Sequence, residues 1–518
     1  MAFVLIGFMG AGKSTLAIEL GEALGVETFD SDRLLEERFG HPVAQEFALS
    51  GEQAFRTAEE ELVCRLLRDS PSDSVIALGG GSVLSEGVRE ELGGHVTVLL
   101  DVDPETAWER VQSSSAGERR PLAADAEAFR ALHSRRLALY EGLADVFVTK
   151  PSSGVASGIA AALRALPEAP PGTRLLWARS ASGEYPVLVG RGLLGEGSEE
   201  RLKRTWPIDR SRSRPFCVSD ENVWALYGHR LGELAGTVAI AAGEDHKTLQ
   251  SAEDVWQGLL DGGMTRADHV VALGGGVVGD LAGFCAATYQ RGVPVVQVPT
   301  TLVAQVDSAY GGKTGVDLPE AKNYVGVYHQ PAGVIVDPDT LETLPAAELA
   351  AGWVEVLKTA LIAGGPLWES VAQGGEVQEQ TILACARTKL AVVGADERDG
   401  GRRQVLNLGH TIGHAIETAT GYGRYRHGEA VGLGLLGALR LSDQEQLRGE
   451  VAELLGARGL PVKLEGATVE SVVEAIARDK KRLGGEVPFV LVRAPGDVQE
   501  GCEVPAAEVQ AAVQELLA

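Results

Sequence analysis

The sequence predicts an α/β protein in two successive units: a nucleotide-binding domain with a parallel sheet, then an α/β half followed by an α-helical half. A glycine-rich phosphate-binding motif stands directly after an apolar run at residues 3–6. Short apolar runs alternate with helical patterns up to about residue 345, as is typical of parallel sheets. Beyond that point helical periodicity dominates to about residue 480.

The glycine-rich motif is Gly7-Phe8-Met9-Gly10-Ala11-Gly12-Lys13-Ser14, which fits G-x-x-x-x-G-K-S. It follows Phe3–Ile6, a predicted buried strand, and a helix is expected to begin near Lys13. Backbone N–H groups of such a loop surround phosphates, the lysine reaches the β/γ oxygens and the Ser14 hydroxyl binds Mg²⁺. The motif therefore predicts binding of ATP with Mg²⁺, through Gly10, Ala11, Gly12, Lys13, Ser14 and Thr15.

Domain boundaries follow from composition and periodicity. Residues 1–165 combine apolar runs at Val75–Leu78 and Val96–Leu100 with a helical pattern from Ala58 to Leu67. The most proline-rich stretch, Leu166–Gly172, predicts a linker at 166–173. We expect an α/β half over 174–345 and a helical half over 346–518, the α/β half including strands near Tyr185–Val189, Pro215–Ser219 and His269–Leu273.

Composition excludes several classes of protein. The net charge of -25 over 518 residues argues against a nucleic-acid partner, which requires clustered Lys and Arg. No apolar run approaches the ~18 residues of a membrane span, so we expect no membrane partner. The five cysteines lack any C-x-x-C spacing, which predicts reduced thiols in a cytoplasmic protein, without disulfides or a cysteine-bound metal.

Charged residues follow the first helix. In Phe29-Asp30-Ser31-Asp32, one carboxylate could assist Mg²⁺ through water while another accepts a proton from an attacking hydroxyl; the competing interpretation is a solvated pair that caps the next helix. Further cations stand at Arg56, at Arg119-Arg120 and at Arg135-Arg136. Taken singly, each arginine is more typical of a surface residue than of a ligand.

A series of motifs runs through the first 165 residues in order: GFMGAGKST, FDSD, SGEQAFR, LGGG, RRPL and RRLALYEGLADV. On these motifs this region resembles shikimate kinase, a P-loop enzyme that transfers the γ-phosphoryl group of ATP to the 3-hydroxyl of shikimate. The resemblance implies that Asp32, Arg56, Gly80 and Arg136 bind shikimate and that Asp32 takes the hydroxyl proton. It implies a lid arginine at Arg120, with Arg119 as the alternative. Another small-metabolite kinase, such as gluconate kinase, is the competing interpretation.

A second glycine motif, Gly274–Gly279, fits G-x-G-x-x-G after an apolar strand. The acidic residue expected about 20 positions later is absent, since nothing acidic lies between Asp280 and Asp307. An ordinary Rossmann domain is therefore disfavoured. A dinucleotide could still bind here, with Asp220 and Asn222 contacting its sugar.

Three of the ten histidines, His410, His414 and His427, cluster in the helical half. His410 and His414, four residues apart, would share one helical face, and such a group predicts a Zn²⁺ site with a further carboxylate ligand; the alternative is buried, hydrogen-bonded histidines. Lys313, Lys322 and Lys358 lie in glycine-rich or apolar stretches, which indicates an anionic ligand; each alone is equally compatible with a surface lysine.

Long motifs fill the region from about 174 to 518: GEDHKTL, GGGVVGDLAGFCAATYQRGV, PTTLVAQVDSAYGGKTGVDLPEAKNYVG, TLETLP, GWVEVLKTA, LNLGHTIGHAIE, HGEAVGLG and RDKK. On these stretches the region resembles 3-dehydroquinate synthase. This resemblance implies conversion of 3-deoxy-D-arabino-heptulosonate 7-phosphate to 3-dehydroquinate and phosphate, with catalytic NAD⁺ and one Zn²⁺ or Co²⁺. NAD⁺ would oxidise the C5 alcohol, phosphate would leave, the ketone would be reduced again and an aldol addition would close the ring.

The same resemblance implies the roles of individual residues. The metal ligands would be Glu355, His410 and His427, with His414 a polar active-site residue instead. Catalytic roles fall to Lys313, Lys358, Arg403 and His414. NAD⁺ would contact Asp220, Asn222, Glu244, Lys247, Gly276, Val277, Val278, Gly279, Asp280, Thr300, Thr301, Lys313, Lys322, Thr340, Leu341, Glu342 and Thr343. The heptulosonate would contact Arg291, Asn323, Lys389, Asn407 and Lys480, with Lys481 as the alternative to Lys480.

Two departures from the family pattern are small: Trp353-Val354 precedes Glu355, and Asp317 replaces a common Asn. Three other interpretations remain for the second unit: a glycerol-dehydrogenase-type alcohol dehydrogenase, another sugar-phosphate cyclase, or a non-catalytic regulatory fusion. Net NADH production from an alcohol would indicate the dehydrogenase. The two expected reactions are non-consecutive steps of the shikimate pathway, and we expect small-molecule partners and a homodimer formed through the second unit.

Overall fold

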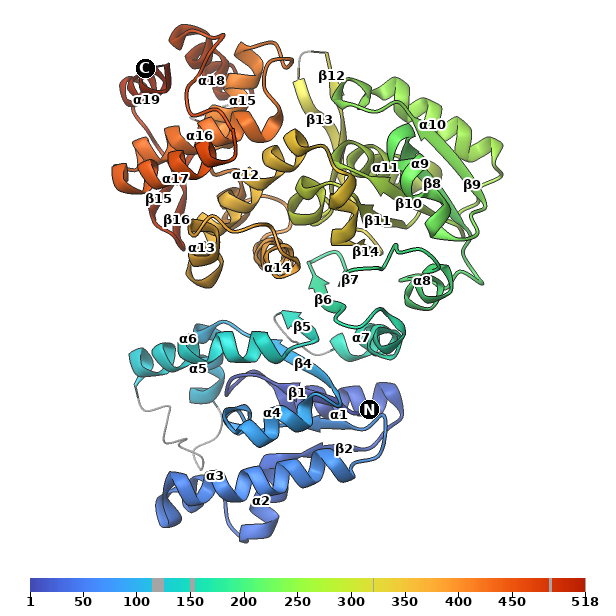
Figure 1. The fold of residues 1–518 in the computed structure, drawn as a ribbon, viewed down its shortest axis with the longest axis vertical. Coiled ribbons are helices and arrows are strands. Elements are labelled where there is room, and N and C mark those ends of the chain that lie inside the picture. Colours follow the sequence, from blue (N-terminus) through green and yellow to red (C-terminus); the bar gives the residue numbers. More distant parts are fainter. Residues whose placement is uncertain (114–124, 150–153, 320, 484–486, 518) are drawn as a thin grey trace. The chain divides into compact units, whose positions relative to one another are not determined.

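The computed structural model describes residues 1–113, 125–149, 154–319, 321–483 and 487–517, with side chains of 479–483 left out. The chain forms two compact units, each with its own core. Unit 1 comprises residues 1–178 and 184–188, and unit 2 comprises residues 179–183 and 189–518. Both are α/β structures, as the sequence predicts (Figure 1).

Unit 1 is built on a sheet whose five N-terminal strands are parallel, in the order β2-β3-β1-β4-β5. The predicted strands 3–6, 75–78 and 96–100 are β1, β3 and β4. Strands β6 and β7 extend this sheet beyond β5, although the sequence pattern groups them with the second unit. The strands are β1 (Phe3–Ile6), β2 (Thr28–Asp30), β3 (Val75–Ala77), β4 (Val96–Asp101), β5 (Val146–Thr149), β6 (Arg174–Arg179) and β7 (Glu184–Val189).

The helices of unit 1 connect these strands. The predicted helix at 58–67 is part of α3, where Gly51 has a φ of 79° and interrupts the helical backbone. The predicted linker begins with the short helix η2 (Leu166–Glu168). The other helices are α1 (Lys13–Leu24), α2 (Ser31–Phe39), α3 (Val43–Asp69), η1 (Ser82–Leu84), α4 (Glu86–Leu92), α5 (Pro104–Ser113), α6 (Ala126–Leu143) and α7 (Val155–Ala165).

The α/β half of unit 2 has a parallel sheet in the order β14-β11-β10-β8-β9. Buried apolar residues such as Val270 and Leu281 pack between the sheet and helices α10 and α11. The elements are α8 (Glu199–Thr205), β8 (Pro215–Asp220), α9 (Glu221–Tyr227), η3 (Gly228–Leu231), β9 (Gly236–Ile240), η4 (Glu244–His246), α10 (Leu249–Asp261), β10 (His269–Gly274), α11 (Gly276–Thr288), η5 (Tyr289–Arg291), β11 (Val295–Pro299) and β14 (Gly333–Val336).

Three further elements follow β11 and carry many of the predicted ligands. They are the π-helical turn η6 (Ala304–Ser308), the antiparallel hairpin of β12 (Lys313–Leu318) and β13 (Ala321–Tyr328), and the 3₁₀ helix η7 (Pro338–Thr343). The hairpin packs against α11 and has a register shift between Val316 and Leu318.

The second half of unit 2 is helical, as predicted, with one short antiparallel hairpin near its end (Figure 1). No helix among the described residues is long and apolar enough to cross a membrane. The elements are α12 (Ala346–Ala363), α13 (Gly365–Ala372), α14 (Glu379–Ala395), η8 (Arg402–Asn407), α15 (His410–Ala419), α16 (His427–Leu441), α17 (Glu445–Ala457), α18 (Val469–Leu483), β15 (Phe489–Ala494), β16 (Asp497–Cys502) and α19 (Ala506–Leu517).

Candidate active sites

The phosphate-binding motif of unit 1 forms a loop between β1 and α1, and α1 begins at Lys13 as predicted. Gly10 has a φ of 80°, and a Cβ there would lie 2.5 Å from the carbonyl oxygen of Ala107, so both the backbone angle and the space require glycine. Lys13 Nζ donates to the carbonyls of Gly7 (2.9 Å) and Phe8 (3.2 Å). The lysine ammonium is thereby held over the loop, where phosphate oxygens would bind.

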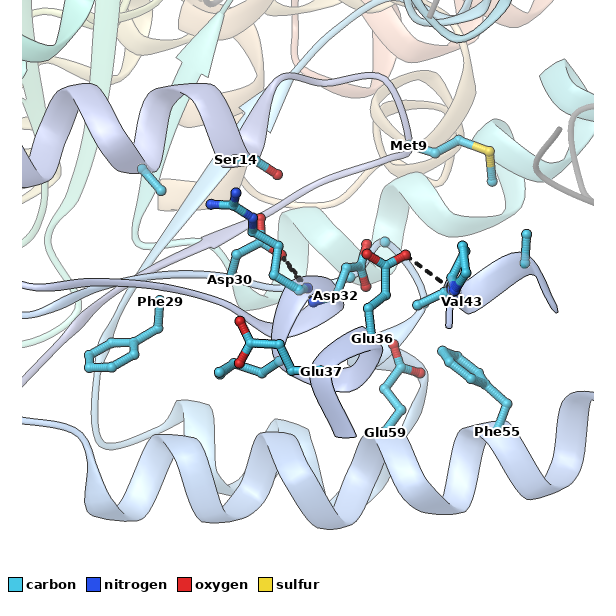
Figure 2. A pocket seen from close by; sticks show the side chains of 18 of the residues that line it. Met9, Ser14, Phe29, Asp30, Asp32, Glu36, Glu37, Val43, Phe55 and Glu59 are labelled. Atoms are coloured by element: carbon cyan, nitrogen blue, oxygen red, sulfur yellow. Dashed lines mark hydrogen bonds between the residues drawn. The ribbon is translucent and has the colours of Figure 1, made fainter. Parts of the chain in front are cut away.

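The loop opens into a cavity of about 790 Å³. Its wall combines residues from the loop after β1, from β2, α1, α2, α3 and α6, and from the turn after β3, which lie far apart in the sequence. The structure brings all four predicted shikimate ligands to this one cavity, together with two of the predicted ATP ligands: Asp32, Arg56, Gly80 and Arg136, with Ser14 and Thr15. Figure 2 shows Asp32 and Ser14 at this cavity.

The two aspartates after β2 have different surroundings. Asp30 Oδ1 accepts hydrogen bonds from the backbone N–H groups of Asp32 (3.0 Å) and Arg33 (3.2 Å), and thus caps α2. Asp32 lies beside the glycine turn, where a Cβ on Gly79 would come within 2.6 Å of its Oδ1 (Figure 2). The capping interpretation therefore applies to Asp30, and Asp32 presents its carboxylate at the cavity.

Arg56 is held by an acid that the sequence analysis did not identify. Its Nη1 forms an ion pair with the carboxylate of Glu59, three residues along α3. Glu59 is 3% exposed and also accepts a 2.8 Å hydrogen bond from Ser82 Oγ, next to the glycine turn. The fixed carboxylate orients the guanidinium at the cavity wall, where it would meet an anionic ligand. The only sequence signal for Glu59 was its position three residues after Arg56.

Arg136, on α6, is buried and donates to the carbonyl oxygen of Gly80 at 3.4 Å. The hydroxyl of Tyr140, one turn later, donates to the same oxygen, and burial raises the pKa of this tyrosine above its usual value. Tyr140 was not predicted as a site residue. The two predicted candidates for the lid arginine, Arg119 and Arg120, lie outside the described residues.

In unit 2, Glu355 of α12 meets two histidines from α15 and α16. Its Oε1 lies 3.8 Å from His410 Nε2 and 3.5 Å from His427 Nε2. Glu355 is fully buried, and Oε1 has no hydrogen-bond donor among the described residues. An oxygen without a donor, facing two imidazole nitrogens, is a donor set that suits a divalent metal ion such as Zn²⁺.

His414 also belongs to this group. One ring nitrogen from each of His410, His414 and His427 lies within 4.8 Å of the others. The geometry thus leaves two ligand sets: the three histidines, or Glu355 with two of them. The set with Glu355 includes the buried oxygen that otherwise lacks a partner.

The two histidines differ in protonation. Burial, assisted by the charge of Lys358, lowers the pKa of His410 to about 3, which keeps this imidazole neutral and able to ligate. Burial opposes protonation of His427, but the carboxylates of Glu355 and Glu417, each 3.5 Å away, outweigh it and raise the pKa to about 10, so a metal ion bound here would displace a proton from this ring. Glu355 itself has a pKa well below its usual value, because Lys358 and the histidines outweigh the effect of burial.

A second buried charge cluster adjoins Glu355. Lys358 is 1% exposed, and its Nζ lies 2.5 Å from Glu355 Oε2 and 4.0 Å from Asp307 Oδ1. Lys389 of α14 is 2.7 Å from the same Asp307 oxygen. Asp307, on η6, therefore lies close to both predicted lysines. In the sequence it appeared only as the next acidic residue after Asp280.

The predicted dinucleotide ligands lie around α11 and η4. Lys247 is 3% exposed, and its Nζ lies 2.7 Å from Glu244, 3.5 Å from Asp280 and 3.8 Å from Asp317. Asp280 is partly exposed, yet desolvation raises its pKa to about 6 despite the nearby ammonium. Gly276, Val277, Val278 and Gly279 form the first turn of α11, whose free N–H groups suit an anionic group.

Other predicted dinucleotide contacts approach from neighbouring segments. Asp220 caps α9 through the N–H groups of Asn222 and Val223, both at 3.0 Å. The turn η7 contains Thr340, Leu341, Glu342 and Thr343. After β11, the Thr300 hydroxyl is buried without a hydrogen-bond partner among the described residues, and Thr301 lies 2.8 Å from the Cβ position of Gly275.

Several predicted ligands are engaged elsewhere or exposed. Arg403 is 2% exposed and donates to the carbonyls of Glu397 and Gly311, the latter at 2.9 Å. Lys313 forms an ion pair with Asp399. The predicted heptulosonate ligands Arg291, Asn323 and Asn407 are exposed, and the side chains of Lys480 and Lys481 lie outside the described residues.

Comparisons with protein families identify the family that each unit matches. The family model of shikimate kinase matches residues 9–166, and the models of the N-terminal and C-terminal parts of 3-dehydroquinate synthase match residues 237–351 and 352–482. The 3-dehydroquinate synthase of Halorhodospira halophila is 42% identical over 341 residues, which are 62% of this chain and 94% of that protein. The enzyme of Caulobacter vibrioides is 40% identical over 355 residues, or 63% and 94% of the two chains.

Among solved structures, 2-epi-5-epi-valiolone synthase from Streptomyces hygroscopicus with NAD⁺ and Zn²⁺ is 27% identical, with a TM-score of 0.58, covering 66% of this chain and 99% of that one. A 2-deoxy-scyllo-inosose synthase complexed with carbaglucose-6-phosphate, NAD⁺ and Co²⁺ is 25% identical, with the same TM-score and the same shares. The identity to 3-dehydroquinate synthases is thus higher than to these other cyclases. The chain belongs to the 3-dehydroquinate synthase family and carries a shikimate kinase domain ahead of the synthase, so one polypeptide joins the two enzymes.

Proposed function

We propose that the cavity of unit 1 is the shikimate kinase active site. Gly10 to Thr15 hold ATP, the Ser14 hydroxyl takes a position on Mg²⁺, and Arg120 closes over the phosphates. Arg56 and Arg136 hold the shikimate carboxylate beside Gly80, since guanidinium groups recognise carboxylates bidentately. The observation that carries this proposal is the meeting of these separate segments at one cavity of about 790 Å³.

Proton transfer in this site falls to Asp32. Its carboxylate is placed beside Gly79, on the cavity wall that also holds Ser14. A carboxylate so placed can accept the proton of the 3-hydroxyl as the hydroxyl attacks the γ-phosphoryl group. Lys13 moves from the loop carbonyls to the phosphate oxygens when ATP binds, because phosphate is the stronger acceptor for an ammonium.

In unit 2, we assign Glu355, His410 and His427 as the ligands of a Zn²⁺ or Co²⁺ ion. The supporting observation is the buried Glu355 Oε1, which faces both histidines without a hydrogen-bond donor among the described residues. A metal bound there supplies a Lewis acid for an alcohol and its ketone. His414 lies beside these ligands and serves as a polar contact to the substrate.

NAD⁺ occupies the region of α11 in this proposal, and when bound it supplies a reversible hydride acceptor. The first turn of α11, Gly276 to Asp280, would hold the anionic part of the dinucleotide, Asp220 and Asn222 would contact its sugar, and Glu244 and Lys247 would make further contacts to it. Thr300, Thr301, Lys313, Lys322 and residues 340–343 complete the contacts. Both solved cyclases described above hold NAD⁺ and a divalent metal, which supports the pairing.

The heptulosonate phosphate is held by cations. Lys358 and Lys389 share the carboxylate of Asp307, which fixes two ammonium groups beside the proposed metal ligand Glu355. Paired, oriented ammonium groups stabilise a dianionic phosphate and the substrate carboxylate at low solvent exposure. The remaining contacts of the proposal are Arg291, Asn323, Arg403, Asn407 and Lys480.

We propose the domain limits 1–165 for the kinase, 166–173 for the linker, 174–345 for the cofactor-binding half and 346–518 for the helical half. A cytoplasmic location fits the four buried thiols and the partly exposed Cys502, none of which forms a disulfide. Homodimerisation through unit 2 stays a prediction from the resemblance.

Two assays on the purified full chain test the proposed function. Unit 1 is expected to form ADP from ATP only when shikimate is added. Unit 2 is expected to release phosphate from 3-deoxy-D-arabino-heptulosonate 7-phosphate in a reaction that requires catalytic NAD⁺, stops with a chelator and accumulates no NADH. Stoichiometric NADH would instead indicate an alcohol dehydrogenase and would contradict the assignment of unit 2.

A further inference from the structure

One buried carboxylate near the proposed metal ligands, Glu417, is not among the proposed catalytic or binding residues. Glu417 lies on α15, seven residues after His410, and its side chain is 2% exposed. Its Oε1 is 3.0 Å from Lys322 Nζ, and its Oε2 is 3.5 Å from His427 Nδ1. Glu417 thus contacts a residue of β13 on one side and a proposed metal ligand on the other.

The contact with His427 determines how that imidazole is presented. Nδ1 faces Glu417, whereas Nε2 faces Glu355 Oε1 at 3.5 Å. An N–H on Nδ1 that donates to Glu417 leaves Nε2 with its lone pair directed at the metal position. His427 is the first residue of α16, its side chain is 39% exposed, and its ring packs against those of His410 and His414, with centroids 5.3 Å and 5.8 Å away.

Glu417 is paired on both sides of its carboxylate. Lys322 Nζ lies 3.0 Å from Oε1, and His427 Nδ1 lies 3.5 Å from Oε2. An ionised carboxylate is a stronger acceptor for the Nδ1–H group than a neutral amide. A buried charge of this kind is costly unless both of its partners stay in place.

We propose that Glu417 is the positioning residue of the metal site: it fixes the tautomer and orientation of His427 and connects that ligand to Lys322 on the β12–β13 hairpin. The inference rests on the proposed assignment of Glu355, His410 and His427 as ligands. In this proposal Glu417 does not bind the metal itself but orients a residue that does.

Glu348 provides a comparison for this role. Glu348 forms an ion pair with Arg426, the residue before His427, at 2.8 Å, and half of its side chain is exposed. Glu348→Gln therefore removes the same charge from the same neighbourhood without touching the imidazole.

The experiment uses the metal-free full chain and Co²⁺ as the probe, with affinity measured by chelator competition and geometry by the visible absorption spectrum of bound Co²⁺. Glu417→Gln is expected to weaken Co²⁺ binding by about 10- to 100-fold and to change the spectrum. Glu417→Asp is expected to recover part of the affinity. Glu348→Gln is expected to remain within about 3-fold of the parent, well short of the effect of removing an outer-shell partner.

A Glu417→Gln affinity within 2-fold of the parent, with an unchanged spectrum, would overturn the inference. If this variant does not fold, the comparison of Glu417→Asp with Glu348→Gln decides, and equal affinities would overturn it. Glu355→Gln distinguishes a wrong ligand set from a wrong role for Glu417. If Co²⁺ binding to the parent does not depend on Glu355, the proposed ligand set is wrong and the inference fails with it.

Discussion

Gly79 offers a direct test of the role of Asp32, because a single methyl group at this position would displace the carboxylate. A Cβ at residue 79 would lie 2.6 Å from Asp32 Oδ1, 2.9 Å from Glu59 Oε1 and 3.1 Å from Ser82 Oγ. Ordinary contact begins near 3.4 Å, so Asp32 has to retreat by about 0.8 Å. The backbone of Gly79 is compatible with alanine, so the substitution acts through space rather than through strain.

A misplacement of about 1 Å in a catalytic group costs up to about 100-fold in rate. We therefore expect Gly79→Ala to lower kcat for shikimate phosphorylation by about 10- to 100-fold, equivalent to about 1.4–2.7 kcal/mol in the barrier. The KM for ATP should change little, since the phosphate-binding loop at residues 7–15 is not altered.

The assay is coupled ADP formation at saturating shikimate and ATP, with phosphate release by unit 2 measured in the same preparation as an internal control. Gly142→Ala is the matched substitution, because a Cβ at that position of α6 has nothing within 4 Å. A Gly79→Ala kcat within 2-fold of the Gly142→Ala value would refute the claim that the position of Asp32 limits phosphoryl transfer.

Three other substitutions test unit 2. Glu355→Gln should lower NAD-dependent phosphate release at least 100-fold, since it removes a proposed ligand, with ADP formation within 2-fold; a loss of both activities would contradict the assignment. Asp268→Asn should destabilise unit 2 by about 1–3 kcal/mol, because the enclosed Asp268 binds the half-exposed Arg214. The pKa of Asp268 is lowered, because hydrogen bonds from Arg214 and Thr265 outweigh the effect of burial. The stabilisation by Asp268 is therefore present at neutral pH, above the pKa of the unfolded state, and is lost in acid. Urea unfolding of the parent and of Asp268→Asn at pH 7 and pH 3 measures both the loss of stability and its pH dependence. His269 has its pKa lowered from 6.5 to about 4, mainly by burial, so unit 2 should lose about 2 kcal/mol between pH 6.5 and pH 5, and His269→Gln should flatten that slope in the same measurement.

Local sequence signals predicted the elements of the kinase site well. The phosphate-binding loop, the helix that begins at Lys13 and strands β1, β3 and β4 follow from an apolar run, a glycine pattern and periodicity, all of which act within a few residues. Strands β6 and β7 show the limit. The apolar pattern at Tyr185–Val189 identifies β7 as a strand, whereas β6 was not among the predicted strands. Pairing of β6 with β5 depends on tertiary contacts that periodicity does not contain.

Buried acids were the main omission at both sites. Glu59, Asp307 and Glu417 each pair with a predicted basic residue, at sequence separations from 3 to 95. In a chain with 72 acidic residues, a glutamate on a helix is usually a solvated partner of a neighbouring lysine or arginine. Only burial distinguishes the acids that orient a functional cation from those on the surface.

The histidines illustrate a second limit. The four-residue spacing groups His410 with His414, and the structure keeps both rings close, with centroids 5.2 Å apart. His427 approaches from the start of α16 and Glu355 from α12, so helix packing rather than spacing brings the four groups together. The resemblance to a family supplied the choice of Glu355, which the pattern of histidines alone left open.

The central claim is that one chain holds two separate active sites, and Lys13→Ala tests it most directly. Lys13 lies in the phosphate-binding loop of unit 1, whereas Glu355 and the three histidines lie in unit 2. The account predicts that Lys13→Ala abolishes ADP formation from shikimate and leaves phosphate release from the heptulosonate phosphate within 2-fold of the parent. Loss of both reactions in a folded protein would contradict the independence of the two sites, and retention of ADP formation would contradict the role of the loop.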